Sequence, residues 1–399
     1  MSPPRPATAA AADAPPRPRL KIVALGNAAS PHDRTRTAVF AGLGHEVSLI
    51  SIAATEVPGV ELIRVPGGEG SRGPWRRIAL LLGTIRAVLG QRADIWHAHY
   101  AADYGAWAAA LARRRPLVVT VMGGDVLFDE QGNQNAIGRA LTRYALRRAD
   151  LVLVKSNALG DVVASFGVPR ARIMRVIWGI DLARFKADPT ETAGLRAEWG
   201  ANGRLVLLAP RMLQAFYNHH LLIEALPAIV SAGHDVIVVF ALKGADPAYR
   251  ARIEAGAGHL GVADRLRFAP PRAPEEMASL YAAADLVVSL APSDGMPQTP
   301  LEAGAVERAA LMTDLPRYRE LFTDGESIAM TALDSAAIAR HASRLLSDAA
   351  LRARIAAGAN RVMRDSADLS SEARRVEARY FALAPAGQRF PATQPDGAG

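Results

Sequence analysis

Residues 291–303, with the sequence APSDGMPQTPLEA, decide the fold of this chain. The run before them, DLVVSL at residues 285–290, has the length and β-branched content of a buried strand. Residues 292–298 then predict a turn, and Thr299 followed by proline predicts a helix with a threonine N-cap. A helix start presents free backbone N–H groups, so this strand–loop–helix unit suits a phosphate or a sugar hydroxyl.

Two acidic residues flank the start of this predicted helix. Asp294 lies on the loop and Glu302 on the first helical turn, eight positions later, so both carboxylates can face one ligand. The pattern Thr299-x-x-Glu302 is also a capping box, in which Glu302 only hydrogen-bonds back to the backbone of Thr299. The local sequence is compatible with both a ligand-binding and a purely structural role for Glu302.

The composition limits the classes of protein to which this chain can belong. The chain has 399 residues, 50% of them hydrophobic, which is enough for two domains of ordinary size. It has no cysteine, which excludes disulfides and thiolate chemistry and favours a reducing, cytoplasmic location. No run reaches the ~18 uncharged apolar residues that a membrane span needs. Residues 1–20 are rich in proline without a continuous apolar core, so they predict a disordered tail rather than a signal peptide.

The net charge of +8 comes almost entirely from arginine. Scattered arginines are typical of a solvated surface, and they also suit anionic lipids or phosphate ligands. The sequence has no basic stripe with interleaved aromatic residues, so we expect no nucleic-acid partner.

Strand and helix patterns alternate along both halves of the chain, which indicates parallel sheets with helices on both faces. Strands are predicted at residues 20–26, 47–52, 60–65, 94–98, 116–122 and 150–156, and then at 204–209, 235–242, 266–269 and 285–290. Helices are predicted at residues 74–89, 104–113, 135–148, 221–232, 247–259, 274–283, 336–347, 350–364 and 371–383. Residues 186–203 are predicted to be an irregular linker. The first strand is followed by GNAAS rather than the GxGxxG turn of a nicotinamide dehydrogenase.

The motifs around the opening stretch resemble those of glycosyltransferase family 4. The family pattern is an acid, seven residues, then glutamate followed by alanine, and this chain has Asp294 and then Glu302-Ala303. Further matches are Ser293, Gly295, Pro297, Leu301, Thr313-Asp314-Leu315-Pro316 and Arg319-Glu320-Leu321. The family more often has glutamate at the place of Asp294, whose side chain is shorter.

The resemblance, which covers roughly residues 20–383, implies the GT-B fold. In this fold two Rossmann-like doubly wound α/β domains face each other across a cleft. Residues 20–185 would form an N-terminal acceptor domain and residues 186–367 a C-terminal nucleotide-sugar domain. A last helix at about 368–383 would cross back to the first domain, and residues 1–19 and 384–399 would be disordered tails. Ligands in open α/β sheets lie beyond the carboxyl ends of the strands, so the site is expected in the cleft.

The resemblance also implies roles for individual residues. Glu302 would accept hydrogen bonds from the ribose hydroxyls of the donor. Asp294 and the backbone amides of the following loop would hold the hexose and the phosphates. The residues of this loop are Gly295, Met296, Pro297, Gln298 and Thr299. Arg211 would pair with the leaving pyrophosphate, where a cation stabilises the charge that builds as the glycosidic bond breaks.

Two departures from the family pattern concern these reacting groups. A lysine usually follows the arginine that pairs with pyrophosphate, but Tyr217-Asn218 stands at that place here. Lys243 follows the next predicted strand and is a candidate to substitute for it, as are His219 and His220. Many family members have a histidine where this chain has Met122, which cannot hydrogen-bond the sugar in the same way.

The end of the strand at residues 116–122 offers further candidates. Two glycines, Gly123 and Gly124, would let a substrate approach the backbone closely. Asp125 follows them as a candidate catalytic residue, and alternatively as a turn or cap residue.

His97 and His99 lie on one face at the end of another strand. No third ligand stands at a useful spacing and there is no Asp-x-Asp motif, so these histidines are predicted to be hydrogen-bonded strand-end residues. GT-B enzymes generally need no bound metal, and the resemblance implies no metal site here.

Residues 74–89, PWRRIALLLGTIRAVL, predict an amphipathic helix. Its apolar face carries Trp75, Ile78, Leu81, Leu82, Ile85 and Leu89, and Arg76, Arg77 and Arg86 lie near that face. This helix either packs on the first sheet or lies on an anionic membrane, where it would bring a lipid-linked acceptor to the cleft.

Together the residues and the resemblance predict a retaining, metal-independent hexosyltransferase. It would use a UDP- or GDP-linked sugar donor and a glycan or lipid-linked acceptor, in polysaccharide or glycolipid synthesis on the cytoplasmic side of a membrane. A sugar-nucleotide-binding scaffold without turnover is an alternative, favoured by the missing lysine, Met122 and the short Asp294. A nucleotide-sugar epimerase of the same fold is another and would need no acceptor.

Overall fold

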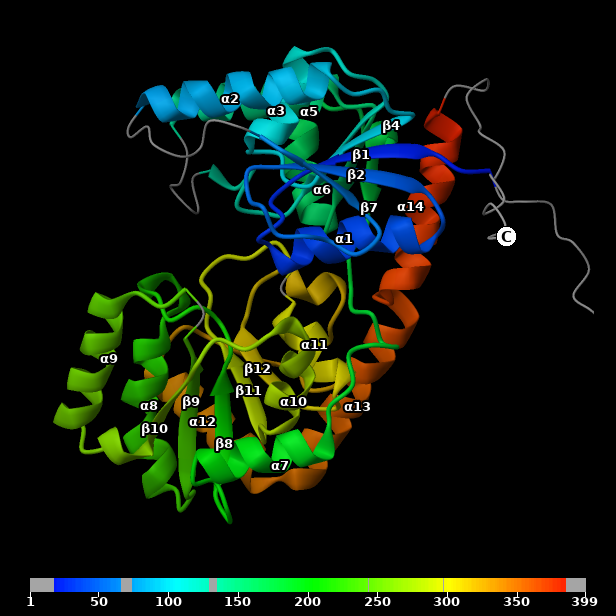
Figure 1. The fold of residues 1–399 in the computed structure, drawn as a ribbon. Helices are drawn as coiled ribbons and strands as arrows, with labels where there is room; N and C mark the ends of the chain where they lie inside the picture. The colour runs from blue at the N-terminus through cyan, green and yellow to red at the C-terminus, as the bar shows by residue number, and fades with distance from the viewer. Residues whose placement is uncertain (1–17, 66–73, 129–134, 243, 297, 385–399) are drawn as a thin grey trace, which may run out of the picture.

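The computed structural model describes residues 18–65, 74–128, 135–242, 244–296 and 298–384. Most of the two predicted tails, together with Lys243 and Pro297, lies outside these residues. The described chain forms two α/β domains, which are drawn one above the other in Figure 1.

The first domain is built on a parallel sheet with the strand order β3-β2-β1-β4-β5-β6-β7. Its strands are β1 (Lys21–Leu25), β2 (Glu46–Ser51), β3 (Glu61–Arg64), β4 (Ile95–Ala98), β5 (Leu117–Val121), β6 (Leu151–Val154) and β7 (Ile173–Arg175). Its helices are α1 (Pro31–Gly42), α2 (Pro74–Leu89), α3 (Tyr104–Leu111), α5 (Ala136–Arg148) and α6 (Asn157–Ser165). The central strands are buried on both faces, as their nearly continuous apolar sequences require.

The second domain repeats this plan with the strand order β10-β9-β8-β11-β12-β13, again all parallel. Its strands are β8 (Leu205–Ala209), β9 (Val236–Ala241), β10 (Leu266–Ala269), β11 (Leu286–Ser289), β12 (Ala310–Thr313) and β13 (Ala329–Thr331). Its helices are α7 (Pro189–Glu198), α8 (His219–Ser231), α9 (Pro247–His259), α10 (Met277–Ala282), α11 (Thr299–Ala305), α12 (Ser335–Ser347) and α13 (Ala349–Ser366).

The last helix, α14 (Leu369–Leu383), returns to the first domain, as Figure 1 shows at the right of the molecule. Its apolar face packs with the first-domain core, where Tyr380 is fully buried beside Phe40, at 5.0 Å between ring centroids. Glu372 also accepts backbone hydrogen bonds from Ile177, at 2.9 Å, and Gly179, at 3.4 Å. The two Rossmann-like sheets and this crossing helix confirm the predicted fold class.

The predicted linker at 186–203 is wrong, because α7 occupies its middle. Asp188 caps this helix, since its carboxylate accepts from the backbone N–H groups of Thr190, at 2.7 Å, and Glu191, at 3.1 Å. Pro189 follows the cap, and Leu195 is buried in the core of the second domain. An Asp-Pro pair before a helix is a recognisable N-terminal signal that the polar composition obscured.

Several elements carried no clear signal in the sequence. The short strands β7, β12 and β13 have three or four residues each, too few to show a period. Helix α1 has a mixed sequence, PHDRTRTAVFAG, and is held at its start by Ser30, whose hydroxyl accepts from the backbone N–H of Asp33.

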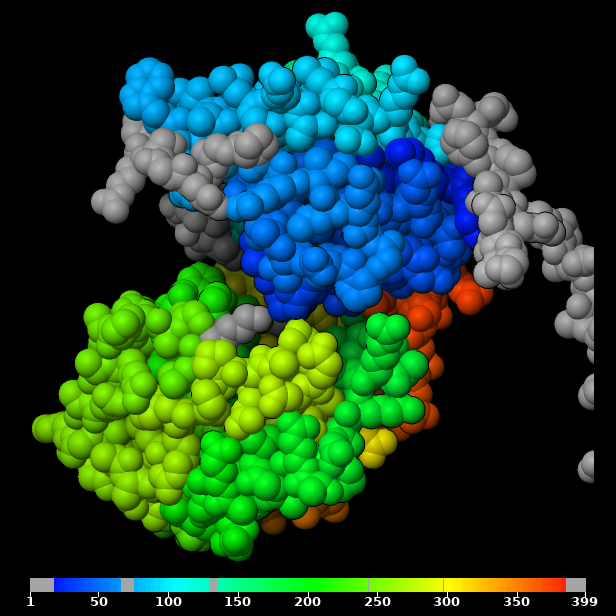
Figure 2. Space-filling view, viewed as in Figure 1, coloured from blue at the N-terminus to red at the C-terminus, as the bar shows by residue number. Residues whose placement is uncertain are grey.

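The two domains touch at the carboxyl ends of their sheets. A methyl group added to Gly295, after β11, would lie 2.3 Å from the carbonyl oxygen of Met122, after β5. A methyl group on Gly123, whose φ is +124°, would lie 3.0 Å from the backbone of Gly295. The predicted close approach to Gly123 therefore exists, but in this structure the backbone of the second domain makes it. Figure 2 shows that the surface is indented between the two domains.

A second link between the domains runs from Glu320 to the start of α6. Its two carboxylate oxygens accept from the backbone N–H groups of Asn157, at 2.5 Å, and Ala158, at 2.9 Å. Because a helix start carries free N–H groups and a partial positive charge, the Glu320 carboxylate is well placed there.

Candidate functional site

Arg211 and Asp294 meet at the carboxyl edge of the second sheet. Arg211 follows β8 and Asp294 follows the neighbouring β11, and their side chains lie 3.2 Å apart between Nη2 and Oδ2. The guanidinium of Arg211 also lies over the ring of Tyr217, 4.7 Å from its centroid. Burial alone would lower the pKa of Arg211. The nearby charge of Asp294 opposes this effect, and the pKa of Arg211 is raised. The two residues predicted from the family motif therefore form one charged pair.

Tyr318 completes this edge of the cleft and carried no signal in the sequence. Its hydroxyl is buried and has no hydrogen-bond partner among the described residues. Burial raises its pKa well above the ordinary value, with a further contribution from Asp294. A neutral phenol beside a carboxylate and a guanidinium can donate to a ligand oxygen.

Glu302 is held differently from the capping-box alternative. Helix α11 begins at Thr299 with Gln298 at the cap position and no side-chain cap, so the predicted threonine N-cap is wrong. The Glu302 carboxylate instead lies beside the hydroxyl of buried Tyr281, whose pKa is raised well above its ordinary value by burial and then by Glu302. Glu302 is half-buried and fixed by a neighbouring helix, which is the arrangement of a prepositioned acceptor.

The loop between Asp294 and α11 is packed against the rest of the protein by two of its side chains. The side chain of Met296 is 1% exposed and belongs to the core of the second domain. Gln298 donates from Nε2 to the carbonyl oxygen of Trp178, at 2.8 Å, and so ties the loop to the end of the first domain. Contacts between a ligand and the backbone amides of Gly295 through Thr299 stay a prediction.

Tyr217 and Asn218 stand where the family has lysine and glycine. Asn218 adopts a left-handed conformation, with φ of 50°, which glycine adopts readily and asparagine tolerates. Its amide donates to the carbonyl oxygen of Leu290, at 3.1 Å, so it also fastens the loop before Asp294. The turn geometry is thus kept while the cation is replaced by an aromatic ring under Arg211.

The two histidines proposed as replacement cations are both engaged elsewhere. The ring of His219 contacts the carbonyl oxygen of Met212 at 3.0 Å, and burial lowers its pKa to about 4. His220 lies 3.0 Å from the hydroxyl of Tyr249, and its pKa is lowered by burial and then by Arg252. Both rings are therefore neutral at pH 7 and supply no positive charge there. Lys243 lies outside the described residues.

Asp125 lies on the first-domain side and is fully buried. Its carboxylate accepts from the backbone N–H groups of Ala101, at 2.9 Å, Met122, at 3.0 Å, and Gly123, at 2.8 Å. Burial raises its pKa although these hydrogen bonds oppose the shift. Asp125 therefore holds the Gly-Gly turn, as the alternative interpretation expected, and its catalytic role stays a prediction.

Met122, at the place where the family has histidine, contacts a buried arginine. Arg36 of α1 lies 2.8 Å from the Met122 sulfur through Nη1, and its Nη2 pairs with Asp33 at 2.6 Å. Arg36 is 4% exposed, so a partly neutralised guanidinium lies beneath the first-domain wall of the cleft.

The prediction of two hydrogen-bonded histidines is confirmed for His97 and wrong for His99. His97 contacts the hydroxyls of Thr120 and Tyr380, each at 2.7 Å. His99 is 1% exposed, yet neither ring nitrogen has a hydrogen-bond partner among the described residues. Burial, with a contribution from Arg36, lowers the pKa of His99 well below its ordinary value. His99 is thus a neutral ring at the carboxyl end of β4 with both nitrogens available.

Lys155 is the functional candidate that the sequence analysis missed. It directly follows β6 and is 2% exposed, so a basic side chain lies buried at the carboxyl edge of the first sheet. Only four of the 47 basic residues are lysine, and a lysine that ends a buried strand was the available signal.

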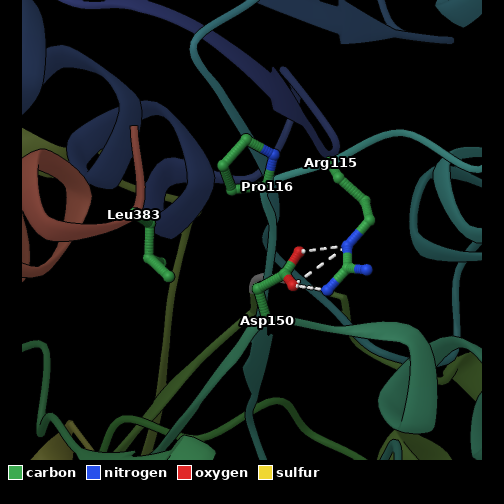
Figure 3. A pocket seen from close by; sticks show the side chains of 4 residues that line it. All are labelled: Arg115, Pro116, Asp150 and Leu383. Carbon is green, nitrogen blue, oxygen red and sulfur yellow. Dashed lines mark hydrogen bonds and ion pairs between the residues drawn. The ribbon is translucent and has the colours of Figure 1, made fainter. Parts of the chain in front are cut away.

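Other parts of the described structure show no competing site. No group of three or more metal-ligating side chains occurs among the described residues. A pocket beside Arg115 and Asp150, which form an ion pair, lies between Pro116 and Leu383 (Figure 3). Pro116 and Asp150 precede β5 and β6, so this pocket is at the amino ends of the strands, away from the edge where ligands of such sheets bind. None of the described helices is long and apolar enough to cross a membrane.

Comparison with known proteins agrees with this geometry. Residues 37–184 match the model described as Glycosyltransferase Family 4, and residues 195–362 match Glycosyl transferases group 1. The sucrose-phosphate synthase structure from Thermosynechococcus elongatus has a TM-score of 0.78 at 17% identity, covering 92% of this chain and 99% of that one. Anabaena Alr3699/HepE, crystallised with UDP and glucose, has a TM-score of 0.76 at 19% identity, covering 92% of this chain and all of that one. The protein is a glycosyltransferase of the GT-B fold.

Its sequence relatives define the family more closely. The D-inositol 3-phosphate glycosyltransferase of Salinispora tropica is 26% identical over 343 residues, covering 77% of this chain and 70% of the relative. The lipopolysaccharide core biosynthesis mannosyltransferase LpcC of Rhizobium leguminosarum bv. viciae is also 26% identical, over 77% of this chain and 83% of the relative. The chain belongs to glycosyltransferase family 4, as a divergent member.

Proposed function

We propose that this glycosyltransferase moves a hexose from a nucleotide-sugar donor to an acceptor hydroxyl, with retention of configuration and without a metal ion. The bond from C1 to the phosphate oxygen breaks, and a bond from C1 to the acceptor oxygen forms. The electrons of the broken bond stay on the diphosphate, and the acceptor proton goes to a phosphate oxygen.

The observation that carries this proposal is the group of polar side chains at the carboxyl edge of the second sheet. Arg211 would neutralise the leaving diphosphate, Asp294 and Tyr318 would bind sugar hydroxyls, and Glu302 would accept from the ribose. A fixed cation at the point where negative charge develops is worth several kcal/mol of transition-state stabilisation, about 3–4 for a single donor. Family membership supports the same assignment.

The acceptor would be a glycan or a lipid-linked sugar in polysaccharide or glycolipid synthesis. The relatives named for D-inositol 3-phosphate and for the lipopolysaccharide core support a phosphorylated or lipid-bound acceptor class. Helix α2 supports peripheral membrane contact, because part of its apolar face is exposed rather than packed on the sheet. The side chains concerned are Trp75, 75% exposed, Ile78, 48%, Leu82, 59%, and Leu89, 58%. Trp75→Ser with Leu82→Ser should reduce co-sedimentation with anionic vesicles and leave the melting temperature unchanged.

A scaffold that binds donor without cleaving it is the second candidate. It is favoured by the contact between Arg211 and Asp294, because an arginine already paired with a carboxylate offers less charge to a diphosphate. A turnover assay separates the two functions, since a scaffold would bind the donor and release no free nucleotide.

The first experiment is a thermal-shift panel of UDP, GDP, ADP and TDP on the full chain. A nucleotide at a hundred times its dissociation constant stabilises by about 2.7 kcal/mol, which raises the melting temperature by several degrees. The nucleotide that does so names the donor base, and its sugars are then tested for turnover, with the anomeric product followed by NMR. If none of the four raises the melting temperature, the cleft does not bind nucleotides and the proposal fails.

Glu302→Gln belongs in the same panel. The variant keeps the volume of the side chain and the contact with Tyr281 but loses the charge, so nucleotide binding should weaken by about tenfold with little change in the melting temperature. Glu307→Gln is the matched control, because Glu307 is exposed and lies two residues after the end of the same helix. A Glu302 variant that melts lower and binds as well as the parent would show that the carboxylate only fastens α11 to α10.

A further inference from the structure

Lys155 lies in the first domain but faces the charged groups of the second. It follows β6 and precedes Ser156, whose hydroxyl caps α6. The start of α6 is fastened to Glu320 of the second domain, and Leu159, in its first turn, packs on Gly295, 3.2 Å from an added methyl group. Asp294 is the neighbour of Gly295 in the chain. The end of β6 and the acidic loop of the second domain are therefore opposite each other.

The side chain of Lys155 is buried without a partner of its own. It is 2% exposed, and no hydrogen bond or ion pair to its Nζ atom is found among the residues that the structure describes. The charged groups close enough to shift its pKa are Arg36 from α1, Arg211 and Asp294 from the second domain, and Glu372 from α14. Two of these are acids with other partners, since Asp294 pairs with Arg211 and Glu372 accepts from the backbone N–H of Ile177. An unpaired buried cation is costly, and a bound anion would offset this cost.

We propose that Lys155 supplies, from the first domain, the second positive charge of the diphosphate site that the chain lacks at Tyr217. This inference rests on the proposed function and names a binding residue for it. Arg211 would contact the diphosphate from the second sheet and Lys155 from the first, so the diphosphate would bridge the two domains. A compact ammonium on a flexible stem suits this position, because three donors can follow a phosphate group as the bond to C1 breaks.

The rarity of lysine supports a specific role. The chain uses arginine at nearly every basic position and has lysine at four of 47. Buried Arg36 shows that this domain accommodates an interior guanidinium where geometry allows. A lysine kept at the most enclosed basic position of the cleft indicates a need for an ammonium there.

The test compares Lys155→Met, Lys155→Arg and the parent, with Lys21→Met as matched control. Lys21 begins β1 at the amino edge of the same sheet, where it pairs with Glu46 at 2.7 Å, so its variant removes the same charge far from the cleft. Dissociation constants are measured for UDP and GDP, and for UMP and GMP, which lack the second phosphate. Lys155→Met should weaken diphosphate binding by about 10- to 100-fold, as for a lost charged hydrogen bond, and monophosphate binding by less than about threefold. Lys155→Arg should recover part of the loss.

The melting temperature and the pH profile separate a binding role from a structural one. Burial lowers the pKa of Lys155 to about 8, with Arg36 as the next contribution. In the parent, kcat/KM should therefore fall as pH rises above about 8, because the ammonium form is lost. This limb should be absent in Lys155→Met, which has no ammonium, and absent in Lys155→Arg, since arginine does not deprotonate. Lys155→Met should melt at the parent temperature or higher, because it removes a buried charge.

If the parent binds none of the nucleotides, the proposed function fails and the role of Lys155 fails with it. If the parent binds a diphosphate and transfers sugar while Lys155→Met does both equally well, the proposed function stands and the assignment of Lys155 is overturned. The assignment is also overturned if Lys155→Met lowers the melting temperature and weakens monophosphate and diphosphate binding alike.

Discussion

The two walls of the cleft differ in how their polar groups are satisfied. On the second-domain wall, Arg211 contacts Asp294 and Glu302 is held by Tyr281, so each charged group already has a partner. On the first-domain wall, His99 and Lys155 are almost completely buried; neither ring nitrogen of His99 has a hydrogen-bond partner among the described residues, and Lys155 has no ion pair there.

This difference indicates that the two walls have different roles in binding and catalysis. Groups that are paired before a ligand arrives are held in place and lose little entropy on binding, which suits recognition of the constant part of the donor. Groups that are buried and unpaired are stabilised when a ligand satisfies them, so they couple binding to the approach of the domains. We therefore expect the loss of Arg211 on the second wall to affect the chemical step, the loss of the Glu302 charge to affect recognition of the nucleotide, and changes on the first wall to affect binding and stability.

Arg211→Met should cause the largest loss. The arginine faces the site where the diphosphate charge develops, so its removal should lower kcat by about 10²- to 10³-fold. Its control is Arg204→Met, at the amino end of the same strand, where Arg204 pairs with Asp235 at 3.0 Å. The measurement is kcat and KM with the donor identified by the nucleotide panel. Equal kcat values in the two variants would show that Arg211 only balances the charge of Asp294.

The sequence predicted the second wall better than the first for a physical reason. Asp294, Glu302 and their strand–loop–helix setting are local, because the residues lie within one short segment whose pattern is recognisable. Alternating strands and helices likewise gave both sheets and most helix bounds, including α2 (Pro74–Leu89) and α9 (Pro247–His259). The partners of these acids, Arg211 and Tyr281, come from distant segments and appear only in the folded chain.

The first wall is formed by contacts between segments that no local pattern connects. Lys155 lies near Asp294 of the second domain and Glu372 of α14, both distant from it in the sequence. The alternation of side chains along the strand places His99 on the same face as His97. Whether its ring has a hydrogen-bond partner depends on α1, which no local pattern connects to it. Helix α7 is a different case, because its Asp188 cap and Pro189 are a local signal that the polar composition of the segment obscured.

Gly295→Ala tests whether the walls must meet, and should have the next largest effect. The added methyl group would lie 2.3 Å from the carbonyl oxygen of Met122, so the two backbones must move apart. Displacing reacting groups by about 1 Å can cost about 10²-fold in rate, so kcat/KM should fall by roughly that amount. Both domains should stay folded, since the clash lies between them, and small-angle scattering should show a larger radius of gyration.

Gly194→Ala is the matched control for this variant. Gly194 lies within α7, and a methyl group added there meets no atom within 4 Å. This variant should keep full activity and gain about 0.5–1 kcal/mol of stability from helix propensity. Full activity in Gly295→Ala as well would contradict the idea that close contact of the walls is needed for transfer.

The smallest expected effect is on the pH dependence of the free energy of unfolding, which protonation of His99 should influence. It is also the most direct test of the first wall. The pKa of His99 in the folded chain is lowered well below 6.5 by burial and then by Arg36, so the unfolded chain binds the proton more readily. Stability from the neutral ring is therefore full above about pH 6.5 and is lost as pH falls below that value, at about 1.4 kcal/mol per pH unit.

His99→Phe should remove this dependence while keeping an aromatic ring against His97, whose centroid lies 4.6 Å from that of His99. Relative to the parent, the variant should gain about 1–2 kcal/mol in the free energy of unfolding between pH 7.5 and pH 5, measured by urea denaturation. The remaining histidines with lowered pKa values, His45, His97 and His219, titrate in both proteins, so the difference reports on His99. A difference that stays constant over this range would mean that His99 is solvated in the folded chain, and the contrast between a paired and an unpaired wall would then rest on Lys155 alone.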